Sequence, residues 1–341
     1  MWGAEEPLPV GGSCLLGSFN LSAYVKDNEF KFEEFKRDIK IVVKGMNDVL
    51  DEGLPLHPLQ IQRDTVRDYR QIGIGIMGIA DMLIKLGLKY GSDEAVALCD
   101  KTGFALADTS MSESALLAKE LGAYPKCKKE LVLESEFVKN NATEETKELI
   151  KEYGLRNSQL LTIAPCGSLS TMLGISGGIE PIFANSYTRK TESLHGEDVY
   201  YKVYTPIVDE YMKKNDIERE EDLPDFFVTS STLNPHERVL MQGVWQDHID
   251  ASISSTVNLP NGATVEDVYE IYTDAWKRGL KGITIYRSGC KREGVLTTSE
   301  TKQEDTTELK RGEYEKTPDS IIEIKRKLKS ALPSPSSVFD A

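Results

Sequence analysis

The stretch Thr162-Ile-Ala-Pro-Cys-Gly-Ser-Leu-Ser-Thr-Met-Leu-Gly-Ile-Ser-Gly-Gly-Ile-Glu-Pro181 decides how the rest of the sequence is interpreted. The apolar run 159–164 predicts a buried strand, and this strand stops at Pro165, which cannot donate to a strand ladder. Small residues follow and predict the start of a helix. Such a turn leaves free backbone N–H groups pointing outward, which suits a phosphate group. The alternative is an ordinary strand-to-helix turn in which Ser168 or Ser170 caps the helix.

Composition and charge restrict the classes of function. The chain has 341 residues, of which 40% are hydrophobic and 28% charged, as in ordinary globular proteins. The net charge of −14 argues against a broad surface for duplex nucleic acid, which needs clustered Lys and Arg. No apolar run approaches the length of a membrane span, and the first residues do not resemble a signal peptide. We therefore expect a cytoplasmic protein that binds neither nucleic acid nor membranes.

Cysteines and histidines give no sign of a metal site. The five cysteines are odd in number and widely spaced, and no C-x-x-C motif occurs, so neither a disulfide framework nor a zinc site is indicated. The four histidines are scattered without metal-ligand spacing, and His195 and His248 are interpreted as surface residues. A buried free thiol is the expectation for most of the cysteines.

The hydrophobic pattern predicts an α/β protein in which helices outweigh strands. We expect helices at 30–50, 69–86, 92–121, 126–153, 199–215 and 265–279, and short strands at 159–164 and 282–286. Residues 300–310 are polar and predict a flexible linker, followed by a short helical segment at 321–332.

Gly73-Ile-Gly-Ile-Met-Gly78 matches the G-x-G-x-x-G pattern of dinucleotide-binding proteins. In those proteins the motif follows a strand and opens a helix. Here the preceding residues 63–70 are mostly Arg and Asp, which argues against a buried strand before the motif. We therefore interpret the glycines as sites of close helix packing and reject nicotinamide binding.

Seven segments, taken in order, resemble the catalytic chain of ribonucleotide reductases, and most closely the adenosylcobalamin-dependent class II enzymes. They are Glu5-Glu-Pro-Leu-Pro9, Gly12-Ser-Cys-Leu-Leu-Gly-Ser-Phe-Asn-Leu21, Arg70-Gln-Ile-Gly-Ile-Gly-Ile-Met-Gly-Ile-Ala-Asp-Met82, Ala164-Pro-Cys-Gly-Ser-Leu-Ser170, Gly177-Gly-Ile-Glu-Pro181, Ser255-Thr-Val-Asn-Leu-Pro260 and Ala275-Trp-Lys-Arg-Gly-Leu-Lys-Gly-Ile-Thr-Ile-Tyr-Arg287. The resemblance covers most of residues 4–297.

The resemblance implies the second half of a ten-stranded α/β barrel, with parallel strands and many surrounding helices. Residues 1–297 would form this C-terminal half and begin inside the finger loop that runs through the barrel. Residues 298–341 would be a polar linker and a short C-terminal segment.

The resemblance also implies the site. Glu5 matches the catalytic carboxylate, and Cys14 matches one member of the cysteine pair that reduces the ribose 2′ carbon. The substrate phosphates would bind the loop that contains Ala164, Pro165, Cys166, Gly167, Ser168, Leu169 and Ser170. Cys166 stands where the family usually has a hydroxyl residue, and Gly3 stands where the family has its radical cysteine.

The leading interpretation is a fragment of a class II ribonucleotide reductase, whose family reaction is the radical reduction of ribonucleotides with adenosylcobalamin. We expect the chain alone to be inactive, because glycine has no sulfur to carry the radical. The second interpretation is a nucleotide-phosphate-binding or assembly module that pairs with a separate N-terminal half of a split reductase. A third is an unrelated α/β enzyme with a phosphate loop. Open strand edges would also favour a homo-oligomer.

Overall fold

The computed structural model describes residues 5–192 and 198–289. The chain divides into two compact units, Met1–Thr297 and Thr298–Ala341, and all of the described residues belong to the first unit. The predicted linker at 300–310 and the predicted helix at 321–332 lie outside the described residues, as do His195 and Gly3.

Five segments of the first unit run parallel and neighbour one another in chain order. Strand β1 (Leu16–Asn20) pairs with β4 (Gly73–Met77), and β7 (Thr256–Leu259) pairs with β8 (Thr284–Arg287). The segment 160–164 lies between these pairs, because Leu161 bridges to Ile74 and Ile163 bridges to Ile253, just before β7. The strand expected at 282–286 is confirmed as β8, whereas the segment 159–164 forms isolated parallel bridges at Leu161 and Ile163 in place of a continuous strand. In the described residues β1 and β8 each have a paired neighbour on one side only.

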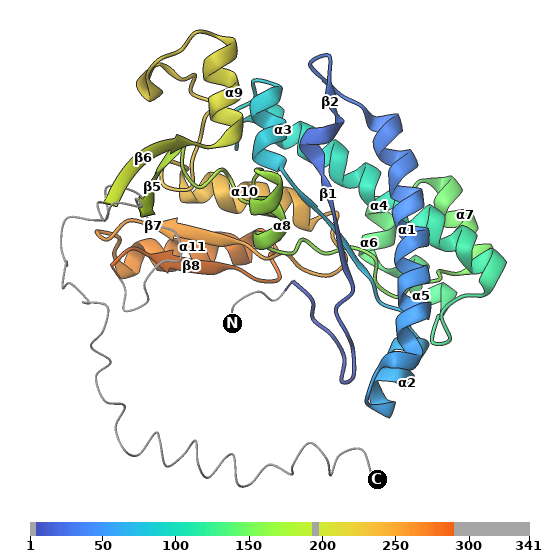
Figure 1. Cartoon of the computed structure of the whole chain (residues 1–341). Coiled ribbons are helices and arrows are strands. Elements are labelled where there is room, and N and C mark those ends of the chain that lie inside the picture. Colours follow the sequence, from blue (N-terminus) through green and yellow to red (C-terminus); the bar gives the residue numbers. More distant parts are fainter. Residues whose placement is uncertain (1–4, 193–197, 290–341) are drawn as a thin grey trace, which may run out of the picture. The chain divides into compact units, whose positions relative to one another are not determined.

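Helices connect the parallel segments and cover one face of them. Helices α1 (Phe32–Gly53) and α2 (Gln60–Tyr69) lead from β1 to β4, and α3 (Ile79–Lys85) follows β4. Helix α4 (Asp93–Leu121) and the short helices α5 (Lys129–Glu134), α6 (Glu136–Asn141) and α7 (Glu144–Tyr153) then return to the sheet. Helices α1 and α4 lie side by side (Figure 1).

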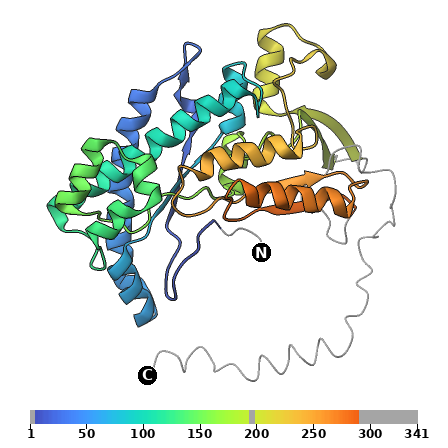
Figure 2. The same ribbon diagram turned by 180° about the vertical axis from the view of Figure 1, so that it is seen from behind.

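The remaining connections hold the candidate loop and an antiparallel ribbon. Helix α8 (Gly167–Leu173) is followed by strands β5 (Ser186–Glu192) and β6 (Asp198–Tyr204), which pair antiparallel. Helices α9 (Pro206–Lys214) and α10 (Pro235–Gln246) come before β7, and α11 (Val265–Lys277) joins β7 to β8. Helices α10 and α11 lie side by side (Figure 2). The short elements are η1 (Leu21–Tyr24), β2 (Val25–Lys26), β3 (Glu29–Phe30), η2 (Leu54–Leu56) and η3 (Glu220–Asp222).

The long helix α4 shows how the local sequence determines where a helix begins and ends. The side chain of Ser92 accepts a hydrogen bond from the backbone N–H of Ala95 at the N-terminus, and acidic residues occupy the first turn. Gly122, with a φ of 86°, ends the helix in a conformation that glycine adopts without strain. Both ends agree with the prediction from sequence.

The helix predicted at 69–86 is wrong. The chain leaves α2 at Tyr69, forms the buried strand β4, turns at Gly78 with a φ of 71° and then enters α3. Glycine is required within β4 because a Cβ on Gly75 would lie 2.0 Å from the carbonyl oxygen of Thr162 in the neighbouring segment. Two motif glycines therefore lie inside the strand instead of after it, which differs from the dinucleotide-binding arrangement.

The helix predicted at 199–215 is also wrong in its first half. Strand β6 occupies Asp198–Tyr204, and the helix begins only at Pro206. Proline is favoured at the first helical position, where its missing N–H has no intrahelical partner to lose.

Candidate functional site

The two faces of the parallel segments differ in chemistry. Because side chains alternate along a strand, the buried Ile74, Ile76 and Ile163 lie on the face covered by α1, α4 and α10. The register places a second set of residues on the other face, here called the polar face because most of them are small or polar: Leu16, Ser18, Asn20, Gly73, Gly75, Met77, Leu160, Thr162, Ala164, Ser252, Ser254, Thr256, Asn258, Thr284 and Tyr286. This alternation of apolar with small or polar residues is readable in the sequence, and it is a signal that could have located the site.

The candidate phosphate loop, residues 164–170, follows the third parallel segment. Ala164 is buried, whereas Pro165, Gly167, Ser168 and Leu169 are exposed. The backbone N–H groups of Gly167, Ser168 and Leu169 are the first three of α8 and have no partner within the helix. These groups are therefore available to donate hydrogen bonds to an anion.

Neither serine proposed as a cap fills that role. The N-cap of α8 is Cys166, in the left-handed region with a φ of 51°, and its side chain makes no capping hydrogen bond. Ser170 is buried and its hydroxyl donates to the carbonyl oxygen of Gly167, over 3.1 Å. Ser170 therefore shapes the loop, and Ser168 is the exposed hydroxyl.

Cys166 attaches the loop to the polar face. Its sulfur lies 3.0 Å from the hydroxyl oxygen of Ser18, in β1. A thiol at this position thus makes a hydrogen bond that joins the first and third parallel segments at one end of the sheet.

Glu5 and Glu6 lie on the same polar face. The main-chain oxygen of Glu5 accepts hydrogen bonds from the Thr162 hydroxyl (2.6 Å) and from the Ser252 N–H (3.0 Å). Since Ser18 and Thr162 belong to one face, the Glu5 segment and the Cys166 thiol share it. This shared face agrees with the expectation that groups for one substrate converge.

Glu6, the neighbour of Glu5, is not a solvated carboxylate. Its Oε2 accepts a hydrogen bond of 2.6 Å from the amide of Gln159, and its Oε1 is buried with no hydrogen-bond partner in the described residues. Burial, above all, raises the pKa of Glu6 to about 7, with smaller contributions from Asp250 and Glu5. Glu6 is therefore a carboxyl group that titrates near neutral pH.

Cys14 is exposed and lies just before β1. Partial burial, followed by the negative charges of Glu6 and Glu5, raises the pKa of its thiol. Cys14 therefore lies within electrostatic reach of both carboxylates. The four cysteines of the described residues are all free, and Cys290 lies outside them.

Two of the three histidines in the described part of the chain, His236 and His248, have side-chain partners in the fold. His248 is buried, not on the surface as predicted, with its ring nitrogens facing Asn141 and Asp100. His236 is paired with Asp274 over 3.0 Å. No group of three or more acidic, histidine or cysteine side chains in residues 5–192 and 198–289 is arranged to hold a metal ion.

Comparison with known proteins identifies the family. The model of the ribonucleotide reductase barrel domain matches residues 4–286. The chain belongs to this family. A vitamin B12-dependent ribonucleoside-diphosphate reductase of Thermoplasma acidophilum is 33% identical, over 97% of this chain and 43% of that protein. A protein of the same description from Mycobacterium tuberculosis is 31% identical, over 87% of this chain and 42% of that protein.

Among solved structures, the alpha subunit of the class Id ribonucleotide reductase of Actinobacillus ureae is similar, with a TM-score of 0.61. It is 18% identical in sequence, and the likeness covers 81% of this chain and 50% of that subunit, so it supports the fold alone. The reductase barrel chain spans less than half the length of the curated relatives it matches. No helix among its described residues has the length and apolar character needed to cross a membrane.

Proposed function

We propose that this chain takes part in the adenosylcobalamin-dependent radical reduction of ribonucleotides to deoxyribonucleotides, and that its five parallel segments form half of the ten-stranded catalytic barrel. One observation carries the proposal: the Glu5 segment and the Cys166 loop lie on the same polar face of the sheet. The vitamin B12-dependent descriptions of the relatives support the class.

The phosphate groups of the nucleotide are proposed to bind the loop of residues 164–170. The free N–H groups of Gly167, Ser168 and Leu169 would donate to phosphate oxygens, and the exposed Ser168 hydroxyl would add a fourth donor. Because most donors belong to the backbone, substitution of the Ser168 side chain removes only a minor part of the affinity. Ala164, Pro165, Cys166 and Ser170 would shape the loop.

The chemistry at the ribose is assigned to Glu5 and Cys14. A radical formed elsewhere removes the 3′ hydrogen, and the Glu5 carboxylate takes the proton of the 3′ hydroxyl. The 2′ hydroxyl takes a proton from a thiol and leaves as water. Cys14 and a second thiol together supply two protons and two electrons, so that hydrogen replaces the 2′ hydroxyl and the two sulfurs become a disulfide. The 3′ hydrogen then returns to the sugar, and Glu5 gives its proton back to the 3′ oxygen. Cys14 is free and exposed, as a thiol in this role must be.

Adenosylcobalamin, when bound, supplies the radical. Helix α8 exposes the side chains of Leu169, Met172 and Leu173 next to the loop, an apolar surface suited to the edge of a large planar cofactor. The proposed compartment is the cytoplasm, where free thiols such as the four described here persist.

The barrel is proposed to be completed by further reductase sequence, on the same polypeptide or on a separate one. In the described residues β1 and β8 each lack a neighbour on one side, and such edges need a partner. The two arrangements differ in whether the chain acts as part of one enzyme or as an assembly module of a split enzyme.

A reconstitution experiment tests the proposal. The chain is assayed for deoxyribonucleotide formation with adenosylcobalamin, a dithiol and ribonucleoside di- or triphosphates, alone and together with the N-terminal part of the Thermoplasma acidophilum relative. We expect no turnover by the chain alone, because Gly3 cannot carry a thiyl radical. Turnover is expected only for Gly3→Cys with the added N-terminal part. Product formed by the unmodified chain alone would contradict the assignment.

Anion binding is tested separately, by titrating inorganic pyrophosphate into the full chain. We expect Ser168→Ala to weaken binding by a few-fold, in the range of one lost hydrogen bond. The control is Ser92→Ala, which removes the cap of α4 and leaves the loop intact. Equal effects of the two substitutions would place the anion elsewhere. Binding without turnover in any reconstitution would favour the second interpretation, a phosphate-binding assembly module.

A further inference from the structure

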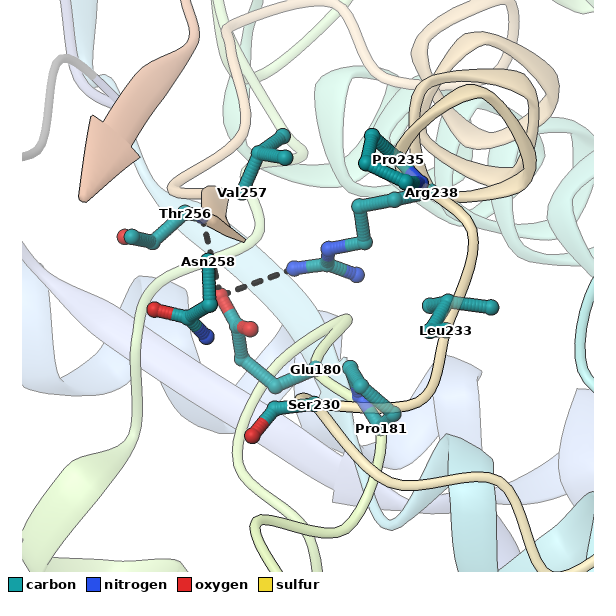
Figure 3. A pocket seen from close by; sticks show the side chains of 9 residues that line it. All are labelled: Glu180, Pro181, Ser230, Leu233, Pro235, Arg238, Thr256, Val257 and Asn258. Carbon is teal, nitrogen blue, oxygen red and sulfur yellow. Dashed lines mark hydrogen bonds and ion pairs between the residues drawn. The ribbon is translucent and has the colours of Figure 1, made fainter. Parts of the chain in front are cut away.

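Arg238 of α10 belongs to a buried polar cluster and lines a small pocket, where Figure 3 shows it paired with Glu180. Its exposed fraction is 3%. One guanidinium nitrogen, Nη1, donates to the main-chain oxygen of Ile179 (2.6 Å) and to the hydroxyl of Tyr90 (2.7 Å). The other, Nη2, lies 2.8 Å from a carboxylate oxygen of Glu180.

The partners of Arg238 hold one short turn, residues 177–180. The hydroxyl of Tyr90 also donates to the Ile179 oxygen, over 2.7 Å, so this single carbonyl receives two hydrogen bonds. The Glu180 carboxylate accepts a further bond of 3.1 Å from the N–H of Thr256, in β7. The turn is thereby tied to α10, to Tyr90 and to the sheet.

The same turn supports the phosphate loop directly, backbone against backbone. A Cβ on Gly177 would lie 2.8 Å from the carbonyl oxygen of Pro165, and a Cβ on Gly178 would lie 2.6 Å from that of Ala164. No side chain fits between the two segments. A displacement of the turn must therefore displace the start of the loop.

The buried cluster is better suited to hold the Ile179 carbonyl and the Glu180 carboxylate in place than to stabilise the fold. Burying a guanidinium and a carboxylate costs desolvation free energy that their attraction offsets only partly. Two of the guanidinium nitrogens, Nε and Nη2, also lack a well-aligned hydrogen bond in the described residues. A planar, two-sided donor does, however, hold the Ile179 carbonyl and the Glu180 carboxylate in one relative orientation, which lysine cannot do.

We infer that Arg238 is a positioning residue for the phosphate loop. Through Ile179 and Glu180 it holds the turn of residues 177–180 against Ala164 and Pro165, and so sets where the free N–H groups of α8 point. The inference rests on the proposed phosphate site and extends it to a residue that touches no substrate.

The test compares Arg238→Lys with Arg70→Lys in the full chain. Arg70 is a matched control: it is 4% exposed, pairs with the carboxylate of Asp51 and makes its side-chain hydrogen bonds away from the loop. Hydrogen exchange of residues 165–173 is measured by mass spectrometry, and pyrophosphate affinity by calorimetry, at a temperature where both variants are folded.

Arg238→Lys should speed exchange in residues 165–173 by about tenfold, as expected for a local opening, and weaken pyrophosphate binding by a similar factor. Arg70→Lys should lower the melting temperature and leave both readouts unchanged. If Arg238→Lys does not fold, Tyr90→Phe is used in its place. Tyr90→Phe removes only one of the two hydrogen-bond donors to the Ile179 oxygen. We then expect exchange in residues 165–173 to rise by about two- to threefold.

The outcomes separate this inference from the phosphate site. Unchanged exchange at residues 165–173 in the folded variant would overturn the positioning role. If the wild type binds pyrophosphate, equal affinity of the variant would overturn it as well. If the wild type binds no pyrophosphate while Arg238→Lys still loosens the loop, the positioning role stands and the proposed phosphate site fails.

Discussion

On the covered face of the sheet β4 presents Ile74 and Ile76, both fully buried, whereas on the polar face the same strand presents Gly73 and Gly75. The covered face meets helices α1, α4 and α10 and holds the main apolar core. The polar face meets the Glu5 segment, through hydrogen bonds from Thr162 and Ser252. Parallel strands covered on both faces are usually apolar throughout. The alternation found here separates an apolar face, which stabilises the fold, from a face lined mostly by small and polar residues.

A substitution on the covered face is expected to have the largest effect on the free energy of unfolding. Ile74→Ala should lower the free energy of unfolding by about 2–5 kcal/mol, because it leaves a cavity in the core. The control is Leu16→Ala on the polar face, where the side chain is 43% exposed and the expected loss is under about 0.5 kcal/mol. Urea denaturation measures both, and similar losses would remove the distinction between the faces.

A substitution on the polar face should lower stability by changing the distance between two neighbouring parallel segments. Gly75→Ala should destabilise by about 1–3 kcal/mol, because the new methyl group would collide with the Thr162 carbonyl and separate two parallel segments. Gly45→Ala in α1 is the control, since a Cβ there meets no atom within 4 Å and favours the helix. The measurement is again urea denaturation, and the prediction fails if Gly75→Ala is as stable as the control.

The polar face should also make stability depend on pH. The pKa of Glu6 is about 7 in the folded chain and 4.5 in its ordinary state, so its protonated form favours folding. The contribution is complete below about pH 4.5 and is lost as the pH rises through 7. Asp250, whose pKa burial raises to about 6, acts in the same direction at lower pH. Urea midpoints from pH 5 to pH 8 should therefore fall less for Glu6→Gln than for the wild type. Parallel pH profiles of the two proteins would contradict the role of Glu6.

The smallest effect concerns the reactivity of Cys14. Because burial and the carboxylates of Glu6 and Glu5 raise the pKa of this thiol, it should react with iodoacetamide at pH 8 more slowly than glutathione does. Glu6→Gln removes one of these charges and should speed the reaction by about two- to threefold. Peptide mapping by mass spectrometry gives the rate, with Cys14→Ser as the control for assignment. A Cys14 that reacts faster than glutathione would contradict the electrostatic argument.

Residues of the candidate site could be predicted from sequence to different degrees. The extended segment before Pro165 and the helix from Gly167 follow from local preferences; the structure has the helix, and it has parallel bridges at Leu161 and Ile163 where a strand was predicted. Glu5 and Cys14 came from family resemblance, and their roles stay predictions. The sequence did not single out Glu6, because its side chain is hydrogen-bonded to Gln159, more than 150 positions away. Arg238 was missed for the same reason, since its partners Tyr90 and Glu180 come from distant segments.

What the sequence determined by itself is local: the capped helix α4, the amphipathic helices α1 and α11, and the strand-to-helix turn of the phosphate loop. Hydrogen-bond caps and apolar periodicity act within a few residues, so they can be read without knowing the fold. Only the tertiary structure decided that the segment 73–77 is a strand, because its glycines serve the approach of Thr162 from a segment far along the chain. The tertiary structure also decided which face of the sheet is covered, since burial depends on which helices lie against it.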